Sequence, residues 1–247
     1  GVRRFCNHRN LFGRAEKLRI EGSVSRIGAG SSFRQLNYNA GIMFEKPGVL
    51  GPASKFISSL KGNFEHPNAY EKLSVDARAG LRYDIDRKQT VSGEVRVEWS
   101  RVTDSFSPVV PRRHLLVSIP LEYVYDGRDN RLDPTEGFRV LAYAEPTHDL
   151  FSGASFVKVR GEASAYQSFG EEDGVVLAGR VAAGSILGAG LAAVPADRRF
   201  YAGGGGSVRG YAFQGVGPRD AAGVPTGGLS FAETSVELRV KVSERFG

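Results

Sequence analysis

Residue types that build disulfides, metal sites and membrane helices are scarce in this chain. Its 247 residues include a single cysteine, so Cys6 has no partner within the chain for a disulfide or a cysteine-rich metal site. No apolar run approaches 18 residues, which excludes a transmembrane helix. No GxSxG nucleophile motif is present. The four histidines are scattered, at His8, His66, His114 and His148. We therefore expect a protein with no enzymatic step, no cofactor and no bound metal.

Glycine, with 32 residues, is abundant and concentrated in one stretch. Between residues 188 and 228 no segment has a strand pattern, and a connection much longer than about 15 residues is usually functional or disordered. Glycine permits positive φ and close backbone approach, and the neighbouring aromatic residues argue against disorder. We predict a structured functional loop with Arg209 at its centre. Its assigned residues are Gly203, Gly204, Gly205, Gly206, Val208, Arg209, Gly210 and Tyr211.

Two anionic partners are disfavoured by the same sequence. A phosphate-binding GxxxxGK[ST] loop starting at Gly205 would need lysine where Tyr211 stands, and no helix follows to hold the anion at its N-terminus. The net charge of +6 is compatible with nucleic acid, but the basic residues are mixed with acidic ones along alternating faces. Nucleic-acid binders gather them in a patch. Contact with anionic lipid headgroups and a charged interior account for the excess.

Apolar and polar residues alternate with a period of two through most of the remaining chain. In the clearest segment, 91–100, valine and tryptophan alternate with serine, glutamate and arginine, which gives one apolar and one charged face. Turn signals separate such segments, among them Pro47-Gly48 and 171–174. Residues 2–10 show no such pattern and are taken as a lead into the fold. The ten predicted strands are 18–25, 35–45, 55–64, 72–83, 91–100, 114–125, 138–144, 156–166, 175–187 and 231–242.

The length of these strands favours an all-β, antiparallel up-and-down barrel that spans a membrane. Soluble strands usually have about five or six residues, whereas a tilted membrane-spanning strand needs about 9 to 11. Alternation alone does not distinguish a soluble sandwich, with its apolar faces inward, from a membrane barrel, with its apolar faces toward lipid. Aromatic residues near strand ends resemble the interfacial girdles of membrane barrels. They are Tyr70, Tyr83, Trp99, Tyr123, Tyr125, Phe138 and Tyr166.

Two motifs in this order resemble the bacterial surface antigen family, the outer-membrane insertase barrels of the BamA/TamA superfamily. The first is 125–137, YDGRDNRLDPTEG; the second runs from Arg198 to Gly204 and continues as Ser207 to Tyr211. The segment 10–16 resembles the entry to the barrel in the TamA-like branch. The resemblance covers nearly the whole chain, so residues 1–247 are assigned to one outer-membrane β-barrel domain, with 188–228 as its inserted loop.

The resemblance implies an outer-membrane protein of a Gram-negative bacterium that helps to insert or export other outer-membrane proteins. Its expected partners are outer-membrane lipids, client outer-membrane or autotransporter proteins, and a periplasm-spanning or inner-membrane partner reached through POTRA domains. Family members carry POTRA domains and further strands, so the chain is expected to be a fragment of ten or eleven strands of a sixteen-stranded barrel. Two alternatives stay open: a two-partner secretion transporter of the same superfamily, and a passive porin-like channel.

The segment 126–137 also admits a calcium-binding reading, because it is rich in oxygen ligands. Its spacing does not match the EF-hand pattern D-x-[DN]-x-[DN]-G. Asp and Asn side chains commonly bond to nearby backbone in turns, and proline fixes φ there, so we predict a structural turn. Its assigned residues are Asp126, Arg128, Asp129, Asn130, Asp133, Pro134 and Gly137.

Arg209 is expected to be the most function-critical side chain. A guanidinium carried by a glycine-rich loop into a charged lumen is a buried cation, and it needs a carboxylate or carbonyl partner. By resemblance, its main partner in this family lies on a strand beyond residue 247. Glu98, Glu237 and Asp76, which the alternation places on inward faces, are the unranked alternatives within the chain.

Overall fold

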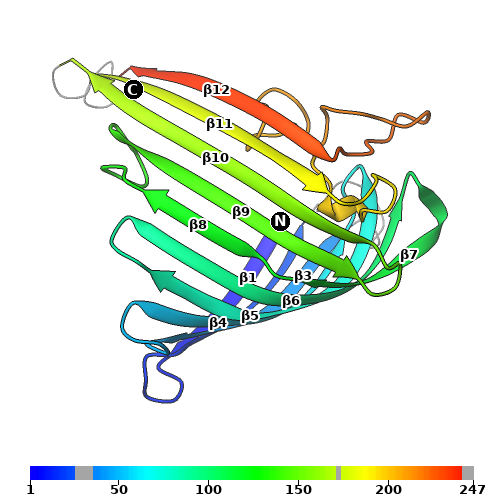
Figure 1. Ribbon diagram of the computed structural model, residues 1–247, viewed down its shortest axis with the longest axis horizontal. Coiled ribbons are helices and arrows are strands. Elements are labelled where there is room, and N and C mark those ends of the chain that lie inside the picture. Colours follow the sequence, from blue (N-terminus) through cyan, green and yellow to red (C-terminus); the bar gives the residue numbers. More distant parts are fainter. Residues whose placement is uncertain (26–35, 171–173, 241–247) are drawn as a thin grey trace.

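A computed structural model describes residues 1–25, 36–170 and 174–240. In this part of the chain, twelve antiparallel strands form one sheet. Figure 1 shows them side by side, with the longest connection between β11 and β12. The strands are β1 (Val2–Arg9), β2 (Lys17–Ser25), β3 (Asn37–Pro47), β4 (Ser54–Glu65), β5 (Tyr70–Asp84), β6 (Gln89–Asp104), β7 (Ser107–Ser118), β8 (Leu121–Asp126), β9 (Gly137–Asp149), β10 (Ser155–Phe169), β11 (Val175–Leu187) and β12 (Ser230–Val240).

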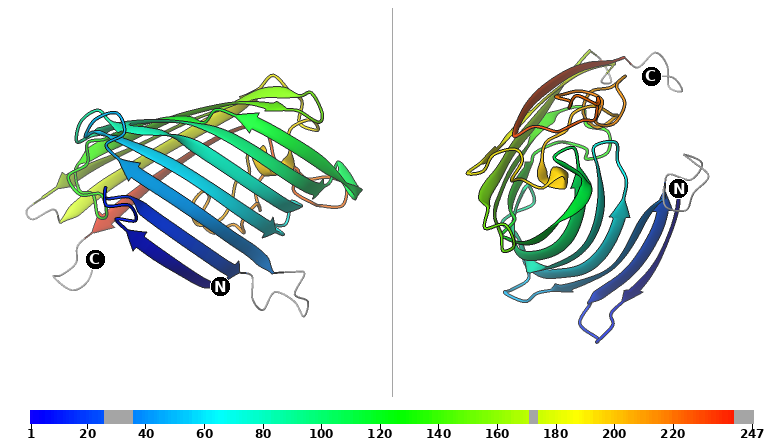
Figure 2. Two further views of the ribbon diagram at one scale, coloured as in Figure 1. Left: turned by 90° about the horizontal axis from the view of Figure 1, so that it is seen from below. Right: turned by 90° about the vertical axis from the view of Figure 1, so that its right-hand side faces the viewer.

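The sheet curls around a concave interior, with β1 and β12 at its two edges (Figure 2). Neighbours in the sheet follow chain order except at one place, where β7 and β8 together fill the position between β6 and β9. The described sheet is therefore eleven strand positions wide. No helix in the described residues is long and apolar enough to cross a membrane.

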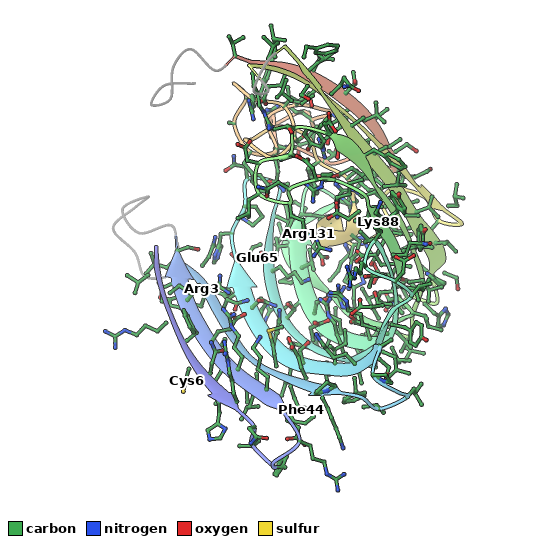
Figure 3. The ribbon with its side chains drawn as sticks, turned by 90° about the vertical axis from the view of Figure 1, so that its left-hand side faces the viewer. Arg3, Cys6, Phe44, Glu65, Lys88 and Arg131 are labelled. Atoms are coloured by element: carbon green, nitrogen blue, oxygen red, sulfur yellow. The ribbon has the colours of Figure 1, made fainter. Side chains whose placement is uncertain are left out.

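Apolar side chains point out of the curve and polar ones point into it. On β6, Val95 and Val97 are 56% and 42% exposed, whereas Glu98 is 1% exposed. On β5, Val75 is exposed and Asp76 is buried. Figure 3 shows nitrogen and oxygen atoms gathered inside the curve. This inside-out arrangement is that of a barrel wall whose outer face meets lipid, and it removes the ambiguity that alternation left.

Two strand predictions need correction. Residues 2–10, taken as a lead, contain β1, an edge strand paired with β2, which runs from Val2 to Arg9 without clear alternation. The predicted strand 114–125 is broken at Ile119 and Pro120, because proline has no N–H to donate to the ladder. The ladder is kept across the break, since Ile119 N–H donates to Pro146 O and Glu94 N–H donates to Pro120 O, both at 3.0 Å.

The other predicted strands lie where expected, and several are longer than predicted; β6 extends the predicted 91–100 in both directions. Three predictions fall partly outside the described residues: the start of strand 35–45, the end of strand 231–242 and most of the turn at 171–174. The aromatic girdle holds only in part. Tyr83, Trp99 and Phe138 are exposed on the outer face. Tyr70 instead contacts Tyr201 of the long loop, with ring centroids 6.2 Å apart, and Tyr166 faces Arg239.

Candidate functional site

The connection between β11 and β12, residues 188–229, lies against the concave face of the sheet (Figure 2). It contains one short 3₁₀ turn, η3 (Ala196–Arg198), which contacts β5. As predicted, it has no strand; its backbone is joined by isolated bridges, Phe200↔Gly228, Ala202↔Val216 and Arg219↔Pro225. The long loop is therefore an ordered body inside the sheet.

The start of the loop rests on a small apolar cluster. Val194, which is fully buried, packs with Phe156 of β10 and Ile186 of β11. Phe200 packs beside this cluster, and its ring contacts that of Phe231 of β12 at a tilt of 38°, with the ring centroids 4.6 Å apart. A side chain at Gly184 would collide with both of these rings, so glycine is required where the loop crosses β11. The cluster places η3 over the inward-facing charges of the sheet.

Arg198, at the end of η3, is the centre of a buried ionic network. Its guanidinium donates to Glu98 of β6 and Glu145 of β9, each at 3.1 Å. Lys72 of β5 lies 3.0 Å from Glu98 and also pairs with Asp197. All five side chains are at most 7% exposed. The network joins η3 to the neighbouring strands β5 and β6 and to β9.

Charge in this network is balanced. Arg96 of β6 pairs with Asp76, Glu98 and Glu145, and Arg78 pairs with Asp76 at 2.7 Å. Burial by itself would raise the pKa of the Asp197 carboxyl, but the charges of Lys72 and Arg198 hold that pKa below its ordinary value. The four carboxylates are Asp76, Glu98, Glu145 and Asp197, and the four cations are Lys72, Arg78, Arg96 and Arg198.

Arg199 forms a second buried attachment. Its side chain is 0% exposed and its Nη2 donates to Asp104 of β6 at 2.7 Å. Nε donates to Val194 O and Nη1 to Thr226 O, both at 3.0 Å. One planar guanidinium thus connects the start of the loop, the end of the loop and the sheet. Arg112 of β7 also pairs with Asp104, at 2.8 Å, so this carboxylate serves two arginines.

The predicted motif lies at the far tip of the loop, beside β12. Ser207 Oγ–H donates to Glu233, and Arg209 lies 3.3 Å from Glu237. The prediction that Arg209 is a buried cation is wrong for the described residues, because its side chain is 80% exposed. Of the three alternative partners, Glu237 is the one in contact, whereas Asp76 and Glu98 belong to the buried network.

The glycines of the tip differ in their backbone φ and in the space that a Cβ atom would find. Gly203 and Gly204 have φ of 106° and 95°, and Gly210 has φ of 87°. A Cβ at Gly203 would lie 2.4 Å from Ala212 O, so the backbone is tightly folded there. Gly205 and Gly206 have open space around them and φ outside the positive range. Val208 is partly buried and Tyr211 is 61% exposed.

The predicted turn motif joins β8 to β9, at the strand ends opposite to those from which the long loop starts, and Arg239 of β12 contacts both its Asp133 and the Arg209 partner Glu237. Asp129 accepts bonds from the backbone N–H of Thr135 and Glu136, each at 3.1 Å, and bonds to backbone lower the pKa of its carboxyl to about 2. The Asn130 side chain accepts from Leu132 N–H at 2.9 Å. Gly137 has φ of 91°, and a Cβ there would lie 2.4 Å from Gly127 O.

Two further ion pairs complete this turn. Arg128 donates to Asp126 through two nitrogens, at 2.7 and 2.9 Å. Asp133, which precedes Pro134, lies 3.3 Å from Arg239 of β12. Within residues 1–25, 36–170 and 174–240, no group of three or more metal-ligating side chains is present. Asp129 and Asn130 thus bond to nearby backbone, which is the behaviour expected of a structural turn, and Asp133 is paired with β12.

Comparison with known proteins agrees with this architecture. A model of the Omp85 superfamily domain matches residues 10–246. Among solved structures, the fold is similar to the crystal structure of BamA from Haemophilus ducreyi lacking POTRA domains 1-3, with a TM-score of 0.82 and 16% sequence identity. The match covers 98% of this chain and 50% of that chain, so this chain spans half the length of that BamA structure.

Proposed function

This chain belongs to the Omp85 superfamily. From that membership we propose that it forms part of the barrel wall of a protein that inserts or translocates other proteins at the outer membrane of a Gram-negative bacterium. The outward apolar face supports a position in lipid. The expected partners are outer-membrane lipids and client outer-membrane proteins. A role in autotransporter assembly, and a periplasm-spanning partner bound through POTRA domains, belong to the same proposal.

The observation that carries this proposal is the structured loop inside the sheet, with its Arg209 tip placed against β12. Within the described residues, the tip contacts β12 through Glu233 and Glu237. We propose that the tip holds this part of the barrel wall in position while a client protein is inserted or translocated.

The test is a folding assay with the full-length protein in lipid vesicles. An unfolded outer-membrane barrel is added, and its folding rate is compared with that in vesicles without the protein. We expect faster folding with the parent protein, a reduced effect with Arg209→Ala and an intact effect with Arg139→Ala. Arg139 is a matched control because it is an inward-facing arginine whose described ion pair, at 3.6 Å, is to Glu162 of β10. Equal client folding with and without the parent protein would refute the proposal.

The same vesicles distinguish the alternatives. A porin-like channel conducts ions steadily and leaves client folding unchanged. The buried network between η3 and β5, β6 and β9 fills part of the space inside the curved sheet with paired charged side chains. This favours a filled interior over a wide pore. A two-partner secretion transporter would move one specific partner across the vesicle membrane without accelerating the folding of other barrels.

A further inference from the structure

We propose that Arg198 and Arg199 are positioning residues that fix the long loop, residues 188–229, to the sheet, so that the loop forms a strut from β5, β6 and β9 to β12. The Arg209 tip then takes its place from this anchor. Only the consequence for client folding rests on the proposed function; the anchor itself is a structural property that can be measured without a client.

Arg199 is the stronger half of the anchor, because it joins the two ends of the loop to each other and to the sheet. Its three nitrogens serve one acceptor at the start of the loop, Val194 O, one at its end, Thr226 O, and one on β6, Asp104. Its guanidinium also lies 4.9 Å from the Phe106 ring. Lysine has no planar fork and cannot satisfy these three directions together.

Arg198 and its neighbours extend the anchor across the sheet. The guanidinium links β6 to β9 through Glu98 and Glu145. The Arg198 carbonyl accepts a bond of 2.8 Å from Lys158 of β10, and Arg112 of β7 donates to Ala192 O. The base of the loop is thereby held by five strands, β5, β6, β7, β9 and β10.

Among the described contacts, those of the tip are more exposed than those of the base. Arg209 and Glu237 are 80% and 39% exposed, and exposed ion pairs contribute little. Ser207 Oγ–H adds a part-buried bond to Glu233. Between base and tip, the buried Gln214 accepts a bond of 3.1 Å from Ala69 N–H, at the β4–β5 connection. The base contacts are therefore expected to hold the loop in place when the Arg209–Glu237 pair is lost.

Hydrogen exchange followed by mass spectrometry tests this in the full-length protein in lipid nanodiscs. Three amides report on the folded loop: those of Phe200, Val216 and Gly228, which donate to Gly228 O, Ala202 O and Phe200 O. In Arg199→Ala these amides should exchange roughly 100-fold faster, since the loop loses the bonds to Asp104, Val194 O and Thr226 O and opens locally. Peptides from β5, β6 and β9 should keep their protection.

Three further variants are compared with Arg199→Ala. Arg209→Ala should accelerate exchange only near the tip and leave Phe200 and Gly228 protected. Arg139→Ala should change nothing in the loop. Arg199→Ala is expected to fold because Arg112 still neutralises Asp104. Arg199→Lys is the milder second variant: it keeps the charge, loses the fork, and should accelerate exchange less than alanine does.

The inference is overturned if exchange of the loop in Arg199→Ala and Arg199→Lys matches that of the parent, or if Arg209→Ala releases the whole loop. These readings require no client. A parent protein that fails to accelerate client folding would refute the proposed function and leave the anchor standing. A loop that stays protected without Arg199 would refute the anchor and leave the proposed function standing.

Discussion

The direction of the apolar face can be tested with one charge placed on either side of one strand. Val97 lies near the middle of β6, 42% exposed on the outer face, beside Ala77 and Val117 of the adjacent strands. Val97→Arg puts a guanidinium into the hydrocarbon. The cost is about 2 to 4 kcal/mol at the bilayer midplane, which corresponds to about 30- to 700-fold in the folding equilibrium.

Ser92 gives the matched control, because it lies on the same strand with its side chain turned into the curve, near Glu122 of β8. Ser92→Arg should therefore be tolerated. Folding of the full-length variants into lipid vesicles is followed by urea titration and by the gel shift of folded barrels on heating. A large loss for Val97→Arg with little for Ser92→Arg supports a lipid-facing outer surface. Equal losses on both faces would refute it and indicate a soluble sandwich.

Two other predictions concern the loops. Gly203→Ala should loosen the loop tip, because φ there is 106° and the new Cβ would lie 2.4 Å from Ala212 O, whereas Gly206→Ala has open space and should be neutral; limited proteolysis of the loop compares the two variants, and equal cleavage would contradict this. The 127–136 turn should loosen on acidification. The pKa of Asp129 falls from 3.8 to about 2 on folding, so its contribution is present above 3.8 and is lost as the pH falls toward 2. Amide exchange of Thr135 and Glu136 across this range measures it, and Asp129→Asn should remove the pH dependence.

Sequence periodicity predicted most strands of this fold. The alternation around Val95 and Val97 predicted both the strand and its apolar and charged faces, because a period of two is a direct property of extended backbone. It failed at β1, because Val2–Arg9 has no clear apolar–polar alternation. It also could not show the interruption at Pro120, since a broken strand and a continuous one have the same residue alternation on either side.

The buried network was beyond this kind of reasoning. Periodicity places Asp76, Glu98 and Glu145 on inward faces, but it does not say which cation each one meets. Lys72 and Asp197 are 125 residues apart in the sequence, and Arg199 and Asp104 are 95 apart. Two adjacent arginines before Phe200 were the available signal. The family motif drew attention to Arg209 instead, which is the more exposed cation.

The inside-out wall also explains why charge, and not an apolar core, holds the loop. Outward positions must be apolar to face lipid, so the alternating inward positions are left for polar side chains. In the part of the chain that the structure describes, the loop packs through its own Val194 on a small apolar cluster with Phe156 and Ile186. Apolar contacts are non-directional, whereas the fork of Arg199 has one orientation that reaches Asp104, Val194 O and Thr226 O together. The ionic anchor therefore fixes the orientation in which the loop reaches β12, where Arg209 lies beside Glu237 and Ser207 bonds to Glu233.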